Sequence, residues 1–421
     1  MSRKILKSIL NYLILLFIPA FICVFALKSD DAFAADWSFS PSATLSQTYD
    51  SNFRFTPTSI PGVSKGDFIT SFSPVVSITG ETEQTKFQFD TNTTAQAYFK
   101  NPDFDTINTN TTASLTEDWS QRFSTSANLG LIHDWTLEDQ LQASGIVAQK
   151  VERYLYSGGL GGKYDLNESL SLTASGLFAK TIYPSGTLPD SDAYQGTITP
   201  IWALTERDNI GLSNSLSYTD YNNATTVKTI TEMFYWQRIL SETLNVKLSG
   251  GYYFTTVDYV IPTLEFIPIP PFIRIVNRPF TTNDTAPVFG VDLNKDWSER
   301  FSTTLSAGSQ QYSDVNARSF DSTFISCTGQ YKLSERTTVN LIVRYNMNNQ
   351  ISQGSEKIDY YIINPSIERS LTENFSVRLS GSYENESDKN YGGVAGTNLN
   401  YDRFRTWVDL IYKWPRFFAS H

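Results

Sequence analysis

The chain has 421 residues, of which 18% are charged and 14% aromatic, and its formal net charge is −10. Soluble globular proteins usually carry about 25% charged residues; here Ser, Thr, Asn, Gln and Tyr fill many of the polar positions instead. The aromatic content argues against a disordered chain, and the net negative charge argues against nucleic acid as a partner.

The N-terminus has the pattern of an export signal. Arg3, Lys4 and Lys7 form a positive region, and the apolar run that follows ends shortly before Ala32-Phe33-Ala34. This order predicts a signal peptide over residues 1–34, removed after Sec-type export, with an uncleaved membrane anchor as the alternative.

Residues 35–421 are predicted to form one domain. Its single cysteine is Cys327, so an internal disulfide is excluded. Beyond the N-terminal segment no apolar run reaches the length of about 18 residues that a membrane helix needs.

Long segments alternate between apolar and polar residues with a period of two. Within residues 85–99 one face carries mainly Phe, Ala and Thr, while the other carries Lys, Gln, Asp and Asn; residues 336–348 and 374–384 repeat the pattern. Successive side chains of a strand point to opposite faces. The patterns hold for about 11–15 residues, whereas soluble strands average about 5–6 residues and a membrane strand needs about 9–11.

Connections of two kinds separate these segments. Eight short polar junctions, several of the form Leu-Ser/Thr-Glu, lie at 80–83, 116–120, 166–168, 205–208, 241–243, 296–300, 334–336 and 372–374. Nine more variable connections carry most of the prolines and lie at 50–66, 100–105, 134–144, 183–191, 221–226, 258–280, 313–318, 350–355 and 386–400. Short turns on one side and long loops on the other are typical of outer-membrane barrels.

The sequence therefore predicts an all-β fold, a transmembrane antiparallel up-and-down β-barrel. Eight turns and nine loops give about 18 strands, in a range of 16–18, with both termini periplasmic. Closure is expected because hydrocarbon offers no hydrogen-bond partner to a free sheet edge.

Aromatic residues near strand ends are expected to form girdles at the two membrane interfaces. The alternative is that they are core residues of a secreted soluble β-protein. They are Tyr98, Trp119, Trp135, Trp202, Trp236, Trp297, Tyr312 and Trp414.

Two strands are less regular than the others. In residues 145–165, Gly158, Gly159, Gly161 and Gly162 predict a bulge or a bend. The last strand is followed by Pro415 and does not end the chain on an aromatic residue.

The chain resembles the β-barrel porin 2 family. The resemblance is carried by the stretch from Ala43 to Phe53, which includes Tyr49-Asp50-Ser51-Asn52-Phe53, and by hairpins of the Leu115-Thr116-Glu117-Asp118-Trp119-Ser120 type. It covers nearly all of the chain after the predicted signal peptide. The resemblance implies an outer-membrane barrel, often encoded beside exopolysaccharide biosynthesis and export systems, and it implies no catalytic residue.

The sequence offers little for enzymatic chemistry. His133 shares its face with apolar residues, while Asp134 points the other way, so a structural interfacial histidine is favoured over a general base. Neither a Cys/His cluster for a metal nor a nucleotide-binding motif occurs. The chain is therefore expected to be no enzyme and to need no cofactor.

Charged residues on the polar faces are candidates for lining a pore. They form either a selectivity ring or ion pairs across strands, and the second interpretation is favoured because both signs are present. The candidates are Lys86, Asp90, Lys247, Arg344, Arg378, Arg403 and Arg405.

The connection at 258–280 is unusually apolar, and a bare apolar loop in water is unfavourable. Three arrangements remain open: a constriction or plug in the lumen, contact with a partner or a polysaccharide, or a β-hairpin above the rim. Its candidate residues are Pro262, Phe266, Pro270, Pro271 and Phe272.

The favoured function is a porin-like channel or conduit for solutes in the outer membrane of a Gram-negative bacterium, with an association with exopolysaccharide export as a finer hypothesis. The alternative is a structural or adhesin-like barrel with a plugged lumen that acts through its extracellular loops. Expected partners are outer-membrane lipid, the barrel-assembly machinery, and polysaccharide or small solutes.

Overall fold

The computed structural model describes residues 36–57, 66–135, 151–222, 225–266, 273–314, 318–351, 356–390 and 396–419. The predicted signal peptide lies outside these residues. The described chain consists of one short 3-10 helix, η1 (Pro102–Phe104), and strands. The strands are β1 (Asp36–Asp50), β2 (Asp67–Glu81), β3 (Thr85–Tyr98), β4 (Thr106–Ser120), β5 (Phe123–Trp135), β6 (Glu152–Asp165), β7 (Leu170–Ile182), β8 (Ser191–Ala203), β9 (Asp208–Tyr221), β10 (Thr225–Ser241), β11 (Leu244–Phe266), β12 (Ile273–Ser298), β13 (Phe301–Ser313), β14 (Ser319–Ser334), β15 (Thr337–Gln350), β16 (Lys357–Ser370), β17 (Phe375–Lys389), β18 (Asn398–Lys413) and β19 (Phe417–Ala419).

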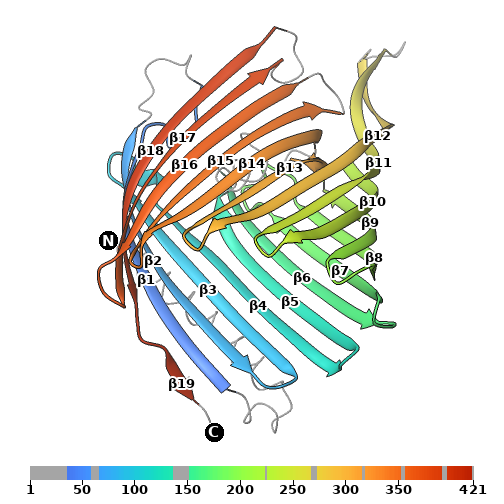
Figure 1. Ribbon diagram of the computed structural model, residues 1–421. Helices are drawn as coiled ribbons and strands as arrows, with labels where there is room; N and C mark the ends of the chain where they lie inside the picture. The colour runs from blue at the N-terminus through green and yellow to red at the C-terminus, as the bar shows by residue number, and fades with distance from the viewer. Residues whose placement is uncertain are drawn as a thin grey trace.

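The strands form one closed antiparallel barrel (Figure 1). Each strand from β1 to β18 pairs with its neighbours in the chain, and β18 pairs with β1 to close the sheet. The predicted count of 18 barrel strands is confirmed, and β19 is a short continuation of the last strand along β1. We call the end with the short connections the short-turn rim and the other the long-loop rim. β1 starts and β19 ends at the short-turn rim.

Alternation gives the barrel wall two chemically different faces. On β17, Val377, Leu379 and Tyr383 share one face, and the last two are 51% and 38% exposed. The register carries this face around the barrel, from Leu379 to Val408 on β18 and from Leu45 on β1 to Phe72 on β2. Exposed apolar side chains on a continuous outer surface suit contact with lipid.

Two of the eight predicted girdle residues do not lie on this outer face. Tyr98 faces inward and packs against Phe53 and Phe104, and Tyr312 packs against inward-facing Phe320. Both residues are at the long-loop ends of their strands, where Phe53 and Phe104 of the connections cover Tyr98 and Phe320 of β14 covers Tyr312. The position of an aromatic residue near a strand end therefore does not by itself show whether its side chain faces outward or into the lumen.

The short turns share one hydrogen-bond pattern. At each of the eight, a Ser, Thr or Asn side-chain oxygen accepts a hydrogen bond from the backbone N–H two residues later; the accepting residues are Thr82, Ser120, Asn167, Thr205, Ser241, Ser298, Ser334 and Thr372. Such side chains replace a backbone partner in a tight turn. Common turn chemistry explains the recurrent Leu-Ser/Thr-Glu form.

The bulge predicted for the glycine-rich strand is absent from β6. Its register runs without a shift against both β5 and β7. A Cβ at Gly159 would lie 2.4 Å from Asn128 Oδ1 and 2.6 Å from Leu177 Cδ2, both on neighbouring strands. Glycine at this position therefore gives room to side chains of the adjacent strands.

Pro415 interrupts the last strand without ending it. After this break, residues 417–419 resume pairing with β1, and the rings of Phe39 and Phe417 lie 6.1 Å apart. Among the described residues, no helix has the length and apolarity required to cross a membrane.

Candidate pore lumen

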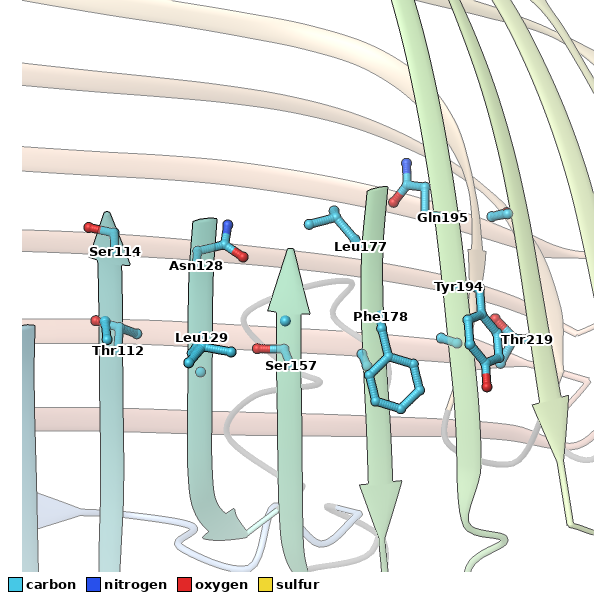
Figure 2. Close-up of a pocket in the computed structure, with 16 residues that line it drawn as sticks. Thr112, Ser114, Asn128, Leu129, Ser157, Leu177, Phe178, Tyr194, Gln195 and Thr219 are labelled. Carbon is cyan, nitrogen blue, oxygen red and sulfur yellow. The ribbon is translucent and has the colours of Figure 1, made fainter. Parts of the chain in front are cut away.

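One side of the lumen is neutral and polar. We call the inward-facing residues of β4 to β9 the neutral wall; between the rims they are mostly Ser, Thr, Asn, Gln, Gly and Ala. A recess of about 530 Å³ on this wall is lined by residues that include Thr112, Asn128, Ser157, Leu177 and Gln195. Figure 2 shows these side chains on successive strands, with strands of the opposite side behind them.

The neutral wall is accessible to water. Thr112, Ser114, Asn128 and Gln195 face inward and are nevertheless exposed. Exposure on the inside of a closed barrel requires open space within it. The charged residues of this wall lie near the rims, as with the Asp134–Arg153 ion pair at 2.7 Å.

The opposite side carries a series of ion pairs, which we call the charged column. It occupies the inner faces of β16 to β18 and continues onto β1. Towards the short-turn rim, Arg378 contacts Glu368 at 2.6 Å and lies 3.9 Å from Asp409. Each carboxylate comes from a strand next to that of the arginine, so adjacent strands are joined across their inner faces.

Higher in the column, two arginines of β18 bind carboxylates on the strands to either side. Arg403 contacts Asp50 of β1 at 2.5 Å, and Arg405 contacts Glu384 of β17. Asp50, Glu384 and Arg403 are almost completely buried. The Asp50–Arg403 pair joins the first and last barrel strands, where the sheet closes.

The Tyr49-Asp50-Ser51-Asn52-Phe53 stretch stabilises the contact between β1 and β18 on the inner side of the barrel. Besides Arg403, the Asp50 carboxylate accepts the backbone N–H of Asn52 at 2.9 Å. The Asn52 side chain donates to the backbone oxygens of Asp402 on β18 and Thr56, at 3.0 and 2.9 Å. The segment thereby folds over the lumen and binds both sides of the β1–β18 contact.

Two aromatic residues anchor the same segment. Phe53 packs against Tyr98 and Phe104, while Phe55 stacks on Tyr401 with ring centroids 5.5 Å apart. Phe55 has φ +48, a conformation that costs free energy for a residue with a bulky side chain. The aromatic contacts on both sides offset that cost.

A group of carboxylates surrounds Arg318 at the long-loop rim. The Arg318 guanidinium contacts Asp314 and Glu356, each at 2.7 Å. Glu386 and Asp388 of β17 lie beside this group and are almost fully buried. Their outward neighbours are polar beyond Tyr383, so both carboxylates lie above the apolar band.

Burial and the neighbouring carboxyl groups change the protonation of this group. Burial, followed by the charge of Asp388, raises the pKa of Glu386 well above its ordinary value. Burial, followed by the charge of Glu356 and a hydrogen bond to it, raises the pKa of Asp388 to about 8. Arg318 opposes both shifts but does not cancel them.

The seven sequence-predicted pore residues all have inward parity by strand register, but they are not brought together. Arg378, Arg403 and Arg405 belong to the charged column, whereas Lys86 pairs with Glu81 at 2.9 Å near the short-turn rim. Asp90 accepts a hydrogen bond from Gln88 at 2.6 Å. Four of the seven thus form ion pairs across strands, and the seven do not form a ring.

Lys247 and Arg344 lie beside aromatic rings. The Lys247 ammonium is 5.0 Å from the Tyr235 ring centroid, and the Arg344 guanidinium is 5.8 Å from that of Phe324. Sequence analysis missed Asp50 and Glu368, which pair with arginines of the charged column, and Arg318 and Glu356, which pair at the long-loop rim. A signal in the sequence existed only for Asp50, because this residue lies in the Tyr49–Phe53 stretch on which the family resemblance is based.

His133 lies on the outer face, as its parity predicts. Its Nε2 is 2.8 Å from Glu152 Oε1, and its ring stacks on Tyr154 at 4.5 Å. Asp134 faces inward and binds Arg153. The structure therefore keeps His133 and Asp134 apart. Among the described residues no group of three or more His, Cys, Asp or Glu is arranged to hold a metal.

The apolar connection at 258–280 continues the barrel strands as a hairpin. β11 and β12 stay paired up to Phe266↔Ile273, and Pro262 is opposite Asn277. Figure 1 shows this pair rising beyond its neighbours at the long-loop rim. Of the three alternatives, the described part of the segment forms the hairpin; Pro270, Pro271 and Phe272 lie outside the described residues.

No family model and no curated protein matches the chain. Several solved structures align over most of its length. OccK2 (OpdF) of Pseudomonas aeruginosa is 10% identical, with 90% of this chain and 98% of that chain covered and a TM-score of 0.45. OccAB2 of Acinetobacter baumannii is 9% identical, with 90% and 98% covered and a TM-score of 0.44. The BenF-like porin of Pseudomonas fluorescens Pf-5 is 9% identical, with 89% and 99% covered and a TM-score of 0.44.

Proposed function

We propose that the protein is a non-enzymatic outer-membrane channel through which small polar solutes diffuse. The observation that carries the proposal is the neutral wall, whose inward-facing Thr112, Ser114, Asn128 and Gln195 are exposed inside a closed barrel. A lumen lined by hydroxyl and amide groups hydrates easily, and an 18-stranded barrel is wide enough for an aqueous path.

The same architecture supports an outer-membrane location with the short-turn rim on the periplasmic side. The apolar outer face suits lipid, and the short-turn rim with both described chain ends corresponds to the periplasmic side of bacterial barrels. Export through the predicted signal peptide and insertion by the barrel-assembly machinery belong to this proposal. Fractionation tests it: the protein should enter detergent with the outer membrane and migrate faster on unboiled gels.

Conductance in planar bilayers tests the channel itself. The purified, heat-modifiable barrel should produce stepwise currents that are linear in voltage at low potentials. Asn128→Trp places a large ring in the lumen and should reduce the step size, whereas Leu129→Trp, on the next residue and the outer face, should leave it unchanged. Folded protein that gives no current would rule the channel out.

A link to exopolysaccharide export is the finer part of the proposal, and it rests on the sequence resemblance to the β-barrel porin 2 family. The neutral, hydroxyl-rich wall is compatible with an uncharged polysaccharide. Deletion of the gene should then lower the amount of polysaccharide at the cell surface. Unchanged surface polysaccharide would remove this link while leaving the channel proposal intact. The adhesin-like alternative has no comparable support, because the described lumen wall is exposed.

A further inference from the structure

A row of polar side chains crosses the outer face of β9 to β11. Asn214 is directly opposite Glu232, and Glu232 is directly opposite Tyr252. Asn214 and Glu232 are both exposed. Their outward-facing neighbours along β10 are Ile230 and Phe234, which are 47% and 50% exposed. An acid and an amide therefore interrupt an otherwise apolar surface.

Ion pairs at the two rims show how deep this row lies. On the same face, Lys228 pairs with Asp258 at 3.3 Å towards the long-loop rim, and Arg238 pairs with Asp208 at 3.6 Å towards the short-turn rim. Glu232 is four residues from Lys228 and six from Arg238. It therefore lies near the middle of the apolar band.

Glu232 and Asn214 have no partner within the described part of the chain. Neither side chain makes a hydrogen bond or an ion pair there, although each could make several. Hydrocarbon supplies no substitute, so polar groups at this depth usually contact another polar group. Asn214 and Glu232 are cross-strand neighbours that do not bond each other in this structure, so both side chains are open to a partner from outside the monomer.

A groove next to the polar row provides space for such a partner. Two adjoining hollows of about 760 and 710 Å³ share Leu160, Gly176, Gly196 and Leu216, and the first also contacts Glu232. A Cβ at Gly196 would meet no atom within 4 Å. Glycine is thus not required here for the barrel to fold, and its effect is to leave the surface hollow.

We propose that this groove and polar row bind a second copy of the chain within the membrane. In a two-fold arrangement the Asn214 amide of each copy donates a hydrogen bond to the Glu232 carboxyl of the other. The same surface on both copies thus forms two equivalent hydrogen bonds. A lipid tail would fill the groove but would supply no hydrogen-bond donor at this depth. The inference requires the proposed membrane location but not conductance.

The first experiment measures the number of copies in mild detergent by light scattering coupled to size exclusion. We expect a dimer for the wild-type protein and for Glu232→Gln, which retains hydrogen bonding. Glu232→Leu should raise the dimer dissociation constant at least tenfold, and Gly196→Leu should do the same by filling the groove. All variants should keep the heat-modifiable migration of a folded barrel.

A matched control lies on β14, outside the groove and the polar row. Gly329 of β14 also faces outward, and a Cβ there would have its closest contact with Phe301 at 4.0 Å. Gly329→Leu should leave the dimer intact. A wild-type monomer at all concentrations, or equal dissociation by Gly329→Leu, would contradict the proposed surface.

The second experiment tests the contact in native membranes by oxidative cross-linking. Ile230→Cys, combined with Cys327→Ser, should give a product of twice the monomer mass. The wild-type protein provides the control, because exposed Cys327 lies on the outer face of β14. It should give no such product. The second copy as occupant would be overturned if Ile230→Cys gave no dimer, or if it cross-linked to a different protein. It would also be overturned if the wild-type protein were a monomer that carries bound lipid and Gly196→Leu had lost that lipid. Loss of conductance with cross-linking intact would contradict only the channel function.

Discussion

Asp50 and Arg403 are 353 residues apart in the chain, yet they form a buried ion pair at the contact between the first and last barrel strands. Both side chains are almost fully removed from solvent. A buried pair of this kind adds little relative to an apolar pair, but removal of one partner leaves an uncompensated charge.

We therefore expect Arg403→Met to destabilise the barrel by about 3–5 kcal/mol, because the Asp50 carboxylate would remain buried without its cation. The midpoint of heat modification on unboiled gels measures the change. Lys86→Met is the control: its ion pair with Glu81 is more than 60% exposed on both sides, and solvent screens such a pair, so this change should leave the midpoint nearly unaltered. Equal losses for the two variants would contradict this assignment.

Gly250 and Gly251 are adjacent but lie in different environments. A Cβ at Gly251 would lie 1.9 Å from the backbone oxygen of Glu232, whereas a Cβ at Gly250 would meet nothing within 4 Å. Gly251→Ala should therefore force β10 and β11 apart and cost about 1–3 kcal/mol, as overpacking does. Gly250→Ala should be close to neutral. The same gel assay, or urea titration of the refolded barrel, separates the two variants.

At the scale of elements, the long-loop ends of β16 and β17 are stabilised by protonated carboxyl groups. Asp388 and Glu386 have raised pKa values in the folded protein, with burial as the largest cause. A group with a raised folded pKa contributes stability that is complete below its unfolded pKa and is lost as the pH rises through the folded value. For Asp388 this window runs from the ordinary carboxyl range up to about 8.

We accordingly expect the end of β17 to loosen as the pH rises from 5 to 9. Amide hydrogen exchange of residues 384–389, corrected for the intrinsic effect of pH, should become faster over this interval. Asp388→Asn should flatten the dependence. Asp359→Asn, which removes an outward-facing carboxylate paired with Lys389 at 3.1 Å, should retain it. A wild-type protein with no such dependence would contradict the carboxyl assignment.

The elements also show how far sequence patterns reach. Period-two alternation predicted the strands of residues 85–99, 336–348 and 374–384, because the face of a side chain follows from the local backbone. The glycines of β6 predicted a bulge or a bend; the strand has no bulge, and it is Asn128 and Leu177 on neighbouring strands that require the space at Gly159. The hairpin at 258–280 was left undecided for the same reason: its pairing joins residues up to 21 positions apart, as with Tyr259 and Phe280.

For the whole molecule, the arrangement of charge predicts ion selectivity. On the charged column, at Arg344 and around Arg318, eight carboxyl groups face five arginines; the carboxyl groups are Asp50, Asp314, Glu356, Glu368, Glu384, Glu386, Asp388 and Asp409. The neutral wall opposite adds little charge away from the rims. With Glu386 and Asp388 protonated, six carboxylates still outnumber the five arginines, so this side of the lumen has a small excess of negative charge, which favours cations.

The reversal potential across a KCl gradient should show a modest preference for K⁺ over Cl⁻. Glu368→Gln should reduce the preference and Arg378→Gln should increase it, each by roughly twofold, because each removes one partner of the same ion pair. The preference should weaken near 1 M salt, where the screening length falls to about 3 Å. Anion preference, or equal shifts in the same direction for both variants, would contradict this account.

The sequence by itself determined the repeating unit of this protein. Strand length, the two faces, the short turns and the count of 18 all follow from residues that are close in the chain, where backbone geometry dictates the pattern. The same parity gives all seven predicted pore charges an inward register without identifying their partners.

Only the tertiary structure decided which of those residues meet. Closure of the sheet brings Asp50 to Arg403, register brings Glu368 to Arg378, and folding of the connection after β13 brings Arg318 to Glu356. These contacts depend on which strands become neighbours and on how connections fold over the lumen. Period-two alternation contains neither piece of information, because it repeats identically in every strand.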